Sequence, residues 1–145
     1  MSGLTLTLML QSTLLAAGPV NYAEAYRQTQ ADGQPLLVLV GADWCPGCVT
    51  MKRGVLPRLT QAGRLKDANL AVVNLDYESD LAGQLMRGGT IPQLIVFAKT
   101  PGGWYREQIT GATSDASVEA LVSRARQAQA TASTAGRSSG GATGR

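Results

Sequence analysis

The chain has 145 residues, the length of one domain with tails. Hydrophobic residues make up 44% of it and aromatic residues only 5%, so the composition predicts a globular domain with an aliphatic core. The net charge of +3 is spread thinly and comes partly from arginines near the C-terminus, which argues against a nucleic-acid-binding surface.

Residues 1–18 fit two interpretations. Residues 4–15 are apolar but too short and too polar to span a bilayer, and Ala16 and Gly18 suit cleavage of an export signal. However, no Lys or Arg precedes Arg27, and the Leu-Thr alternation near the start also fits an N-terminal strand. The pattern favours an exported protein, periplasmic or secreted, over a cytoplasmic one.

Residues 19–126 are expected to form the folded domain. Asn21 is a good cap for a helix that ends at Gly33, and the apolar run 35–40 predicts a strand buried on both faces. A helix then begins within the cysteine pair and weakens at Gly54, and Pro57 opens a further helical piece that runs to about residue 66.

The second half of the domain alternates in the same way. Residues 70–75 predict a strand, and the next helix, capped by Ser79 or Asp80, stops at the glycines 88–89. Two strands, 90–97 and 104–110, are joined by a turn, and Thr113 or Ser114 caps a last helix. This order predicts an α/β fold with a four-stranded mixed sheet and helices on both faces. Residues 127–145 lack apolar surface, which predicts a disordered tail rich in Ala, Ser and Gly.

The only two cysteines, Cys45 and Cys48, enclose Pro46 and Gly47 at the predicted start of a helix. Proline is favoured at the first helical position, so Cys45 falls at the cap. Unpaired N–H groups and the helix dipole stabilise a thiolate there, which makes Cys45 the predicted attacking sulfur. Cys48 lies one turn further on and can close a disulfide with it.

Two other interpretations of the pair remain open. A structural zinc site needs four ligands, and the chain has no histidine and no second cysteine pair. A purely structural disulfide around two intervening residues would restrict the unfolded chain little. The spacing therefore favours redox chemistry over either role.

Four segments together resemble the thioredoxin superfamily over about residues 21–126. They read Ala-Asp-Trp-Cys-Pro-Gly-Cys, Asn-Leu-Asp, Thr-Ile-Pro and Gly-Ala, and they stand at residues 42–48, 74–76, 90–92 and 111–112. With Lys52 four residues after the second cysteine, the chain is most similar to exported thioredoxin-like domains of bacterial thiol:disulfide interchange proteins.

The resemblance implies a thioredoxin fold and a substrate groove. It implies that the Ile91–Pro92 bond is cis and lies against the cysteines, that the Ile91 backbone pairs with an extended substrate, and that Trp44 and Gly111 flank the groove. Without the resemblance, Pro92 is an ordinary proline at the start of a strand.

The chain also departs from the family pattern. Many members carry a buried acid where this sequence has Leu39, and a lysine where it has Val72. Asp43 is therefore a candidate proton carrier, although it equally fits a surface residue, and Lys52 is expected to favour the thiolate slightly. The Pro-Gly dipeptide suggests a redox potential between about −270 mV, as in thioredoxin, and about −120 mV, as in a strongly oxidising relative.

These features predict a thiol-disulfide oxidoreductase that reduces or exchanges protein disulfides. Its partners would be protein thiols or disulfides and an upstream redox protein. We expect no cofactor, no metal, no nucleic acid and no stable membrane span, and we expect a monomer. The alternative is a non-catalytic thioredoxin-fold binding module with a passive disulfide, which the missing buried acid supports.

Overall fold

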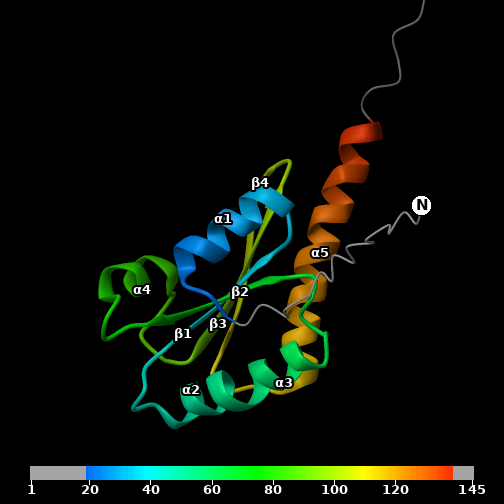
Figure 1. Cartoon of the computed structure of the whole chain (residues 1–145). Helices are drawn as coiled ribbons and strands as arrows, with labels where there is room; N and C mark the ends of the chain where they lie inside the picture. Colours follow the sequence, from blue (N-terminus) through cyan, green and yellow to red (C-terminus); the bar gives the residue numbers. More distant parts are fainter. Residues whose placement is uncertain (1–18, 139–145) are drawn as a thin grey trace, which may run out of the picture.

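The computed structural model describes residues 19–138, which form a four-stranded mixed sheet with helices on both faces (Figure 1). The sheet order is β2-β1-β3-β4, with β2 parallel to β1 and the other two pairs antiparallel. This is the predicted architecture. The elements in chain order are α1 (Tyr22–Asp32), β1 (Leu36–Gly41), α2 (Pro46–Thr50), η1 (Met51–Val55), α3 (Leu56–Gln61), β2 (Asn69–Asn74), α4 (Ser79–Leu85), β3 (Gln93–Thr100), β4 (Gly103–Thr110) and α5 (Asp115–Ser138).

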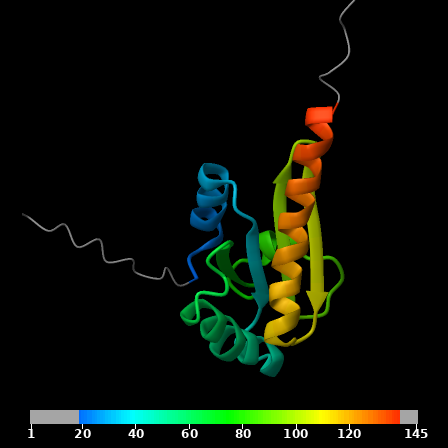
Figure 2. The ribbon, with the colours of Figure 1, turned by 90° about the vertical axis from the view of Figure 1, so that its right-hand side faces the viewer.

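The inner strand β1 is buried along its whole length, as its uninterrupted apolar sequence predicts. Its alternate side chains enter two separate cores. Leu37 and Leu39 pack with η1, α3 and α5 on one face, whereas Leu36, Val38 and Val40 pack with α1 and α4 on the other. Figure 2 shows α1 and α5 on opposite sides of the sheet. Both faces of β1 are therefore fixed by packing. This also fixes the position of the loop that follows its C-terminal end.

The predicted helix start at Asn21 is confirmed. Its side chain accepts a hydrogen bond from the Glu24 N–H at 2.9 Å, and Gly33 ends α1 with a φ of 73°. Val20, just before the cap, makes an isolated parallel bridge with Ala71 at the outer edge of β2. The start of the described chain is thus tied to the sheet.

The predicted break at Gly54 takes a different form. α2, η1 and α3 follow one another without interruption over residues 46–61, and η1 is a π-helical turn in which the Leu56 N–H reaches the Met51 carbonyl. Pro57 explains the wider turn, because proline has no N–H and its ring conflicts with the carbonyl four residues earlier. The helix ends at Gln61, whereas the sequence predicted an end near residue 66.

The start of α4 also differs from the prediction. Glu78, and not Ser79 or Asp80, occupies the cap position. The Glu78 carboxylate accepts a hydrogen bond from the backbone N–H of Asn74 at 3.2 Å, so it ties the helix start to the end of β2. At α5 the prediction holds, since Ser114 Oγ accepts a hydrogen bond from the Ser117 N–H at 3.3 Å.

The prediction that order is lost after residue 126 is wrong for residues 127–138, because α5 continues to Ser138. This segment is rich in alanine, which has the highest helix propensity, and Thr131 and Thr134 hydrogen-bond to carbonyls of the preceding turn. Gln129 Nε2 also donates to the carbonyls of Gly33 and Lys99. Helix propensity and these contacts replace the apolar stripe that the segment lacks.

Two predictions fall on segments that the structure leaves undescribed. These are the export signal or strand over residues 1–18 and the last seven residues of the tail. Within residues 19–138, no helix is both long enough and apolar enough to cross a membrane.

Candidate active site

Cys45 and Cys48 are joined in a disulfide at the point where β1 gives way to α2, with their Cα atoms 5.2 Å apart. Cys45 caps the helix in an extended conformation, and Pro46 takes the first position, as predicted. The Cys48 backbone N–H donates to Cys45 Sγ at 3.3 Å. The sulfur of Cys45 thus receives one of the N–H groups that a helix start leaves unpaired.

Both cysteines are largely covered. Cys45 is 6% exposed and Cys48 3%, while Pro46 between them is exposed and Gly47 half-buried. They form a small cluster with Ala42, against which Leu75 and Ile91 pack. Access to the disulfide is therefore narrow and lies on the side of Cys45.

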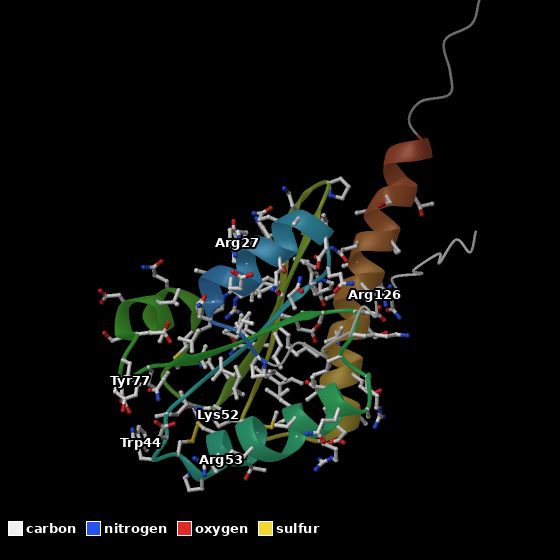
Figure 3. All side chains as sticks on the ribbon, viewed as in Figure 1. Arg27, Trp44, Lys52, Arg53, Tyr77 and Arg126 are labelled. Atoms are coloured by element: carbon white, nitrogen blue, oxygen red, sulfur yellow. A yellow bond between two sulfur atoms is a disulfide. The ribbon has the colours of Figure 1, made fainter. Side chains whose placement is uncertain are left out.

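Trp44 projects from the loop directly before Cys45 and is 68% exposed (Figure 3). Its indole Nε1 donates to Asp76 Oδ2 at 3.0 Å, and the Asp76 N–H is in turn held by Asn74 Oδ1 at 2.9 Å. The loop after β2 therefore fixes the exposed ring beside the disulfide. Asp76 belongs to the Asn-Leu-Asp motif, but its role as an anchor for Trp44 was not predicted.

The loop before β3 also adjoins Cys45. The Ile91–Pro92 bond is cis, as the family resemblance implied, and the Ile91 carbonyl oxygen lies 4.0 Å from Cys45 Sγ. Gly111 donates its N–H to the Pro92 carbonyl at 2.8 Å, with a φ of 96° that favours glycine. The structure thus brings Ile91, Pro92 and Gly111 together beside the disulfide.

Gly47 is the point of closest approach between the cysteine loop and this second loop. A Cβ atom at Gly47 would stand 3.3 Å from Pro92 Cδ and 3.5 Å from the Ala112 Cβ. Glycine therefore allows the start of α2 to rest on the proline.

Gln93 is a site residue that the sequence analysis missed. It is fully buried, and its Oε1 accepts the Arg87 N–H at 3.1 Å. Its Nε2 lies 3.0 to 3.2 Å from the carbonyl oxygens of Arg87, Gly88 and Thr90. A single amide side chain thus holds the loop that carries Ile91 and Pro92. The only signal in the sequence is a polar residue at the start of an otherwise apolar strand.

Gly41 was also missed. It ends β1, and a Cβ atom there would stand 2.7 Å from Cys48 Sγ and 2.9 Å from Cys48 Cβ. Such distances are too short for any side chain, so the sulfur of Cys48 needs glycine at this position. In the sequence, Gly41 is indistinguishable from a residue that merely ends a strand.

A cavity of about 20 Å³ adjoins Cys48. Leu39 and Val72, which stand where many members of the resembled family carry a buried acid and a lysine, both line it. At its rim Lys52 Nζ pairs with Asp43 Oδ1 at 3.5 Å, and both side chains are exposed. A space of this size holds about one water molecule. Asp43 and Lys52 thus lie beside the cavity that adjoins Cys48.

Among residues 19–138 no three His, Cys, Asp or Glu side chains are grouped so that they could hold a metal ion.

A family model described as thioredoxin-like matches residues 17–99, more than half of the chain. Among solved structures, Trxlp from Edwardsiella tarda is 31% identical, with 72% of this chain and 95% of that chain covered and a TM-score of 0.55. A thioredoxin from Thermus thermophilus is 23% identical, with coverages of 84% and 94% and a TM-score of 0.60. Chloroplastic thioredoxin z shares the fold at 17% identity, with coverages of 77% and 95% and a TM-score of 0.61. No curated protein matches the chain.

Proposed function

The chain belongs to the thioredoxin-like family, and on this premise we propose that it is a thiol-disulfide oxidoreductase that acts on protein disulfides through Cys45 and Cys48. The observation that carries the proposal is the placement of the disulfide. It lies at the start of a helix, with the Cys45 sulfur 4.0 Å from the Ile91 carbonyl oxygen.

Cys45 is the attacking residue. In the disulfide form its sulfur lies at the start of the helical run 46–61, next to the Cys48 N–H, and reduction would leave a thiol at this helix start. Both the donated hydrogen bond and the helix dipole favour the thiolate over the thiol, which lowers the pKa of a cysteine in this position. Cys48 is more deeply buried, which suits it to the second step, the attack on a mixed disulfide between Cys45 and the substrate.

In the reducing direction, the Cys45 thiolate attacks one sulfur of a substrate disulfide, and the other substrate sulfur leaves as a thiolate. Cys48 then loses its proton and attacks Cys45 Sγ. This step releases the second substrate thiolate and closes the Cys45–Cys48 disulfide. The substrate has gained two electrons and the protein has lost two, so a dithiol partner must reduce the pair for the next cycle.

The same steps run backward when the disulfide form meets a substrate dithiol. The partner and the compartment decide the direction, and an intermediate redox potential would permit both. Equilibration with glutathione buffers measures this potential. A value outside the window of about −270 to −120 mV would contradict the intermediate assignment.

A polypeptide substrate would lie across the loop of Ile91 and Pro92. The Ile91 carbonyl oxygen is near the Cys45 sulfur, so an extended segment that bonds to this backbone brings its own sulfur within reach. Trp44, next to Cys45, and Gly111, whose N–H bonds to the Pro92 carbonyl, would flank this segment.

Asp43 would receive the proton of Cys48. The support is its position at the rim of the small cavity that adjoins Cys48, where one water molecule can bridge the two groups. Lys52 pairs with Asp43 at this rim and holds the carboxylate there. Asp43 is the only carboxylate among the residues that line the cavity, where the other ionisable side chains besides Cys48 are Lys52 and Arg53.

The proposed location is outside the cytoplasm. The apolar segment over residues 4–15 and the small residues that follow it support an export signal, and so does the resemblance to exported interchange domains. Mass spectrometry of the mature N-terminus tests this. An intact N-terminus on the protein from its native cells would contradict cleavage after Gly18.

Two measurements separate the enzyme from a binding module with a passive disulfide. Thiol titration of the reduced protein should give a Cys45 pKa below that of an ordinary cysteine, and the protein should reduce insulin. In addition, Cys48→Ala should accumulate a mixed disulfide on Cys45, while Cys45→Ala should trap no substrate. An ordinary Cys45 pKa together with no insulin reduction would favour the binding module.

A further inference from the structure

Two large aromatic side chains beside the disulfide are almost uncovered. Tyr77 is 81% exposed and Trp44 is 68% exposed. The other two exposed aromatic residues, Tyr26 and Trp104, stack on each other with ring centroids 6.1 Å apart, whereas neither Trp44 nor Tyr77 stacks on a ring in the described part of the chain. Trp44 and Tyr77, here called the aromatic rim, therefore present apolar surface with no internal partner.

The aromatic rim is held in place and is continuous with the site. Trp44 adjoins Cys45 in the chain, and its indole bonds to Asp76, the residue before Tyr77. The backbone N–H groups of Tyr77 and Glu78 both donate to the Asn74 carbonyl, at 3.2 and 2.8 Å. Figure 3 shows Trp44 and Tyr77 at the same edge of the molecule. A segment that reaches Cys45 past Trp44 therefore meets a fixed loop that carries Tyr77.

The chain segment around Tyr77 is acidic, in contrast to the positive net charge of the whole chain. Residues 67–86 contain no Lys or Arg, and Asp76, Glu78 and Asp80 flank Tyr77 in the sequence. None of these three carboxylates forms an ion pair within residues 19–138, whereas Asp43, Asp67 and four other acidic side chains do. Aromatic faces attract Arg and Lys, and neighbouring carboxylates strengthen that attraction.

We propose that the aromatic rim binds the polypeptide segment next to the substrate disulfide and selects segments that carry Arg or Lys beside the reacting cysteine. Tyr77 supplies an exposed face for the cationic side chain, and the carboxylates around it complement the charge. Exposed aromatic residues next to a site commonly anchor a partner in this way. The inference rests on the proposed oxidoreductase function and names the chemistry of its substrate.

The test uses two peptide disulfides that differ only in the residues flanking the cysteine, Arg in one and Glu in the other. The wild-type protein should reduce the Arg peptide with a kcat/KM about two- to fivefold above that for the Glu peptide, the range that an exposed cation–aromatic contact gives. Tyr77→Ala should lower this ratio through KM, and Tyr77→Phe should retain it. Asp80→Asn should lower it, and added salt should reduce it for the wild type.

Trp104→Ala is the matched control, because it removes an exposed aromatic side chain that the structure places away from the disulfide, and it should leave the ratio unchanged. Turnover of hydroxyethyl disulfide, which has no flanking peptide, tests the reaction itself. A wild-type protein that turns it over but treats both peptides alike, or a Tyr77→Ala variant that keeps the ratio, overturns the specificity inference alone. Absence of turnover with hydroxyethyl disulfide overturns the oxidoreductase proposal and this inference with it.

Discussion

The sulfur of Cys48 occupies the space that a side chain on Gly41 would need, since a Cβ atom there would stand 2.7 Å from Sγ. Gly41→Ala should therefore displace Cys48. We expect it to lower the free energy of unfolding of the oxidised protein by about 1 to 3 kcal/mol, the usual cost of overpacking. It should also shift the redox potential to a more oxidising value, because the disulfide form needs Cys48 in this position.

Gly83→Ala is the control for that change. Gly83 lies in α4 with nothing within 4 Å of a built Cβ atom, so alanine should stabilise the helix by about 0.5 to 1 kcal/mol. Chemical denaturation of both variants gives the comparison. Equal stability of the Gly41→Ala variant and the wild-type protein would show that Cys48 moves aside at little cost.

Gln93→Leu should loosen the loop that carries Ile91 and Pro92. The amide of Gln93 bonds to the backbone of Arg87 and lies near the carbonyls of Gly88 and Thr90, which leucine would leave without that partner. We expect a loss of about 1 to 3 kcal/mol in unfolding free energy and a raised KM for insulin. Gln84→Leu, on the exposed side of α4, should change neither quantity.

Asp43→Asn should slow the step in which Cys48 loses its proton. We expect a fall of about tenfold in the rate of resolution near neutral pH, below the full effect of a well-placed general base because Asp43 is exposed. The defect should shrink as the pH rises, because Cys48 then ionises without help. Lys52→Gln keeps the carboxylate but removes its ion-pair partner, so it should slow this step less than Asp43→Asn does. Stopped-flow measurement of the rate of mixed-disulfide decay tests both variants. If this rate depends on pH in the same way for Asp43→Asn and for the wild type, Asp43 is not the proton acceptor.

Asp115→Asn should make the Tm of the protein less dependent on pH in the acidic range. Arg58 donates to both Asp115 oxygens and holds the pKa of that carboxyl below its usual value of 3.8. Because the folded pKa is lowered, the stabilisation is fully present above pH 3.8 and is lost as the pH falls through the lowered pKa. The wild-type Tm should therefore exceed that of the variant at neutral pH, and the difference should narrow in acid.

Arg58→Gln provides the matched test of that pair. It should reproduce the loss in Tm at neutral pH, and the double variant should add little to either single change. A Tm difference that stays constant from neutral pH into strong acid would show that the pair does not carry the effect.

Local signals in the sequence were sufficient for the helix starts at Asn21 and Cys45 and for the buried strand β1. Capping residues, proline position and an apolar run each act within a few residues, so their effects can be predicted from the sequence. The cis bond before Pro92 came only from the family resemblance, because an isolated Ile-Pro pair does not distinguish the two isomers. The residues that support the site were harder to find.

Gly41 was missed because it meets its partner, Cys48, only in the folded structure. Gln93 was missed because its partners lie in a loop with no recognisable sequence pattern. The requirement for glycine at residue 41 arises only once Cys48 is folded back against β1, and the role of Gln93 only once the loop before it curls around the amide. Asp76 was missed as an anchor for the same reason, since Trp44 is 32 residues away in the chain. The prediction ended α5 too early because the residues after 126 have little apolar surface to bury. The high helix propensity of their alanines nevertheless favours a helix there.

The direction of α5 separates the two ends of the molecule. The helix starts near the disulfide, where the Thr113 N–H donates to Met51 Sδ, and its last turns extend past the tip of the hairpin between β3 and β4 (Figures 1 and 2). Its 24 residues span about 36 Å at the rise of an α-helix. A dye, surface tether or fused domain joined after Ser138 would thus lie far from the disulfide and would not block its substrates. That end is therefore the suitable point of attachment for immobilised or labelled forms.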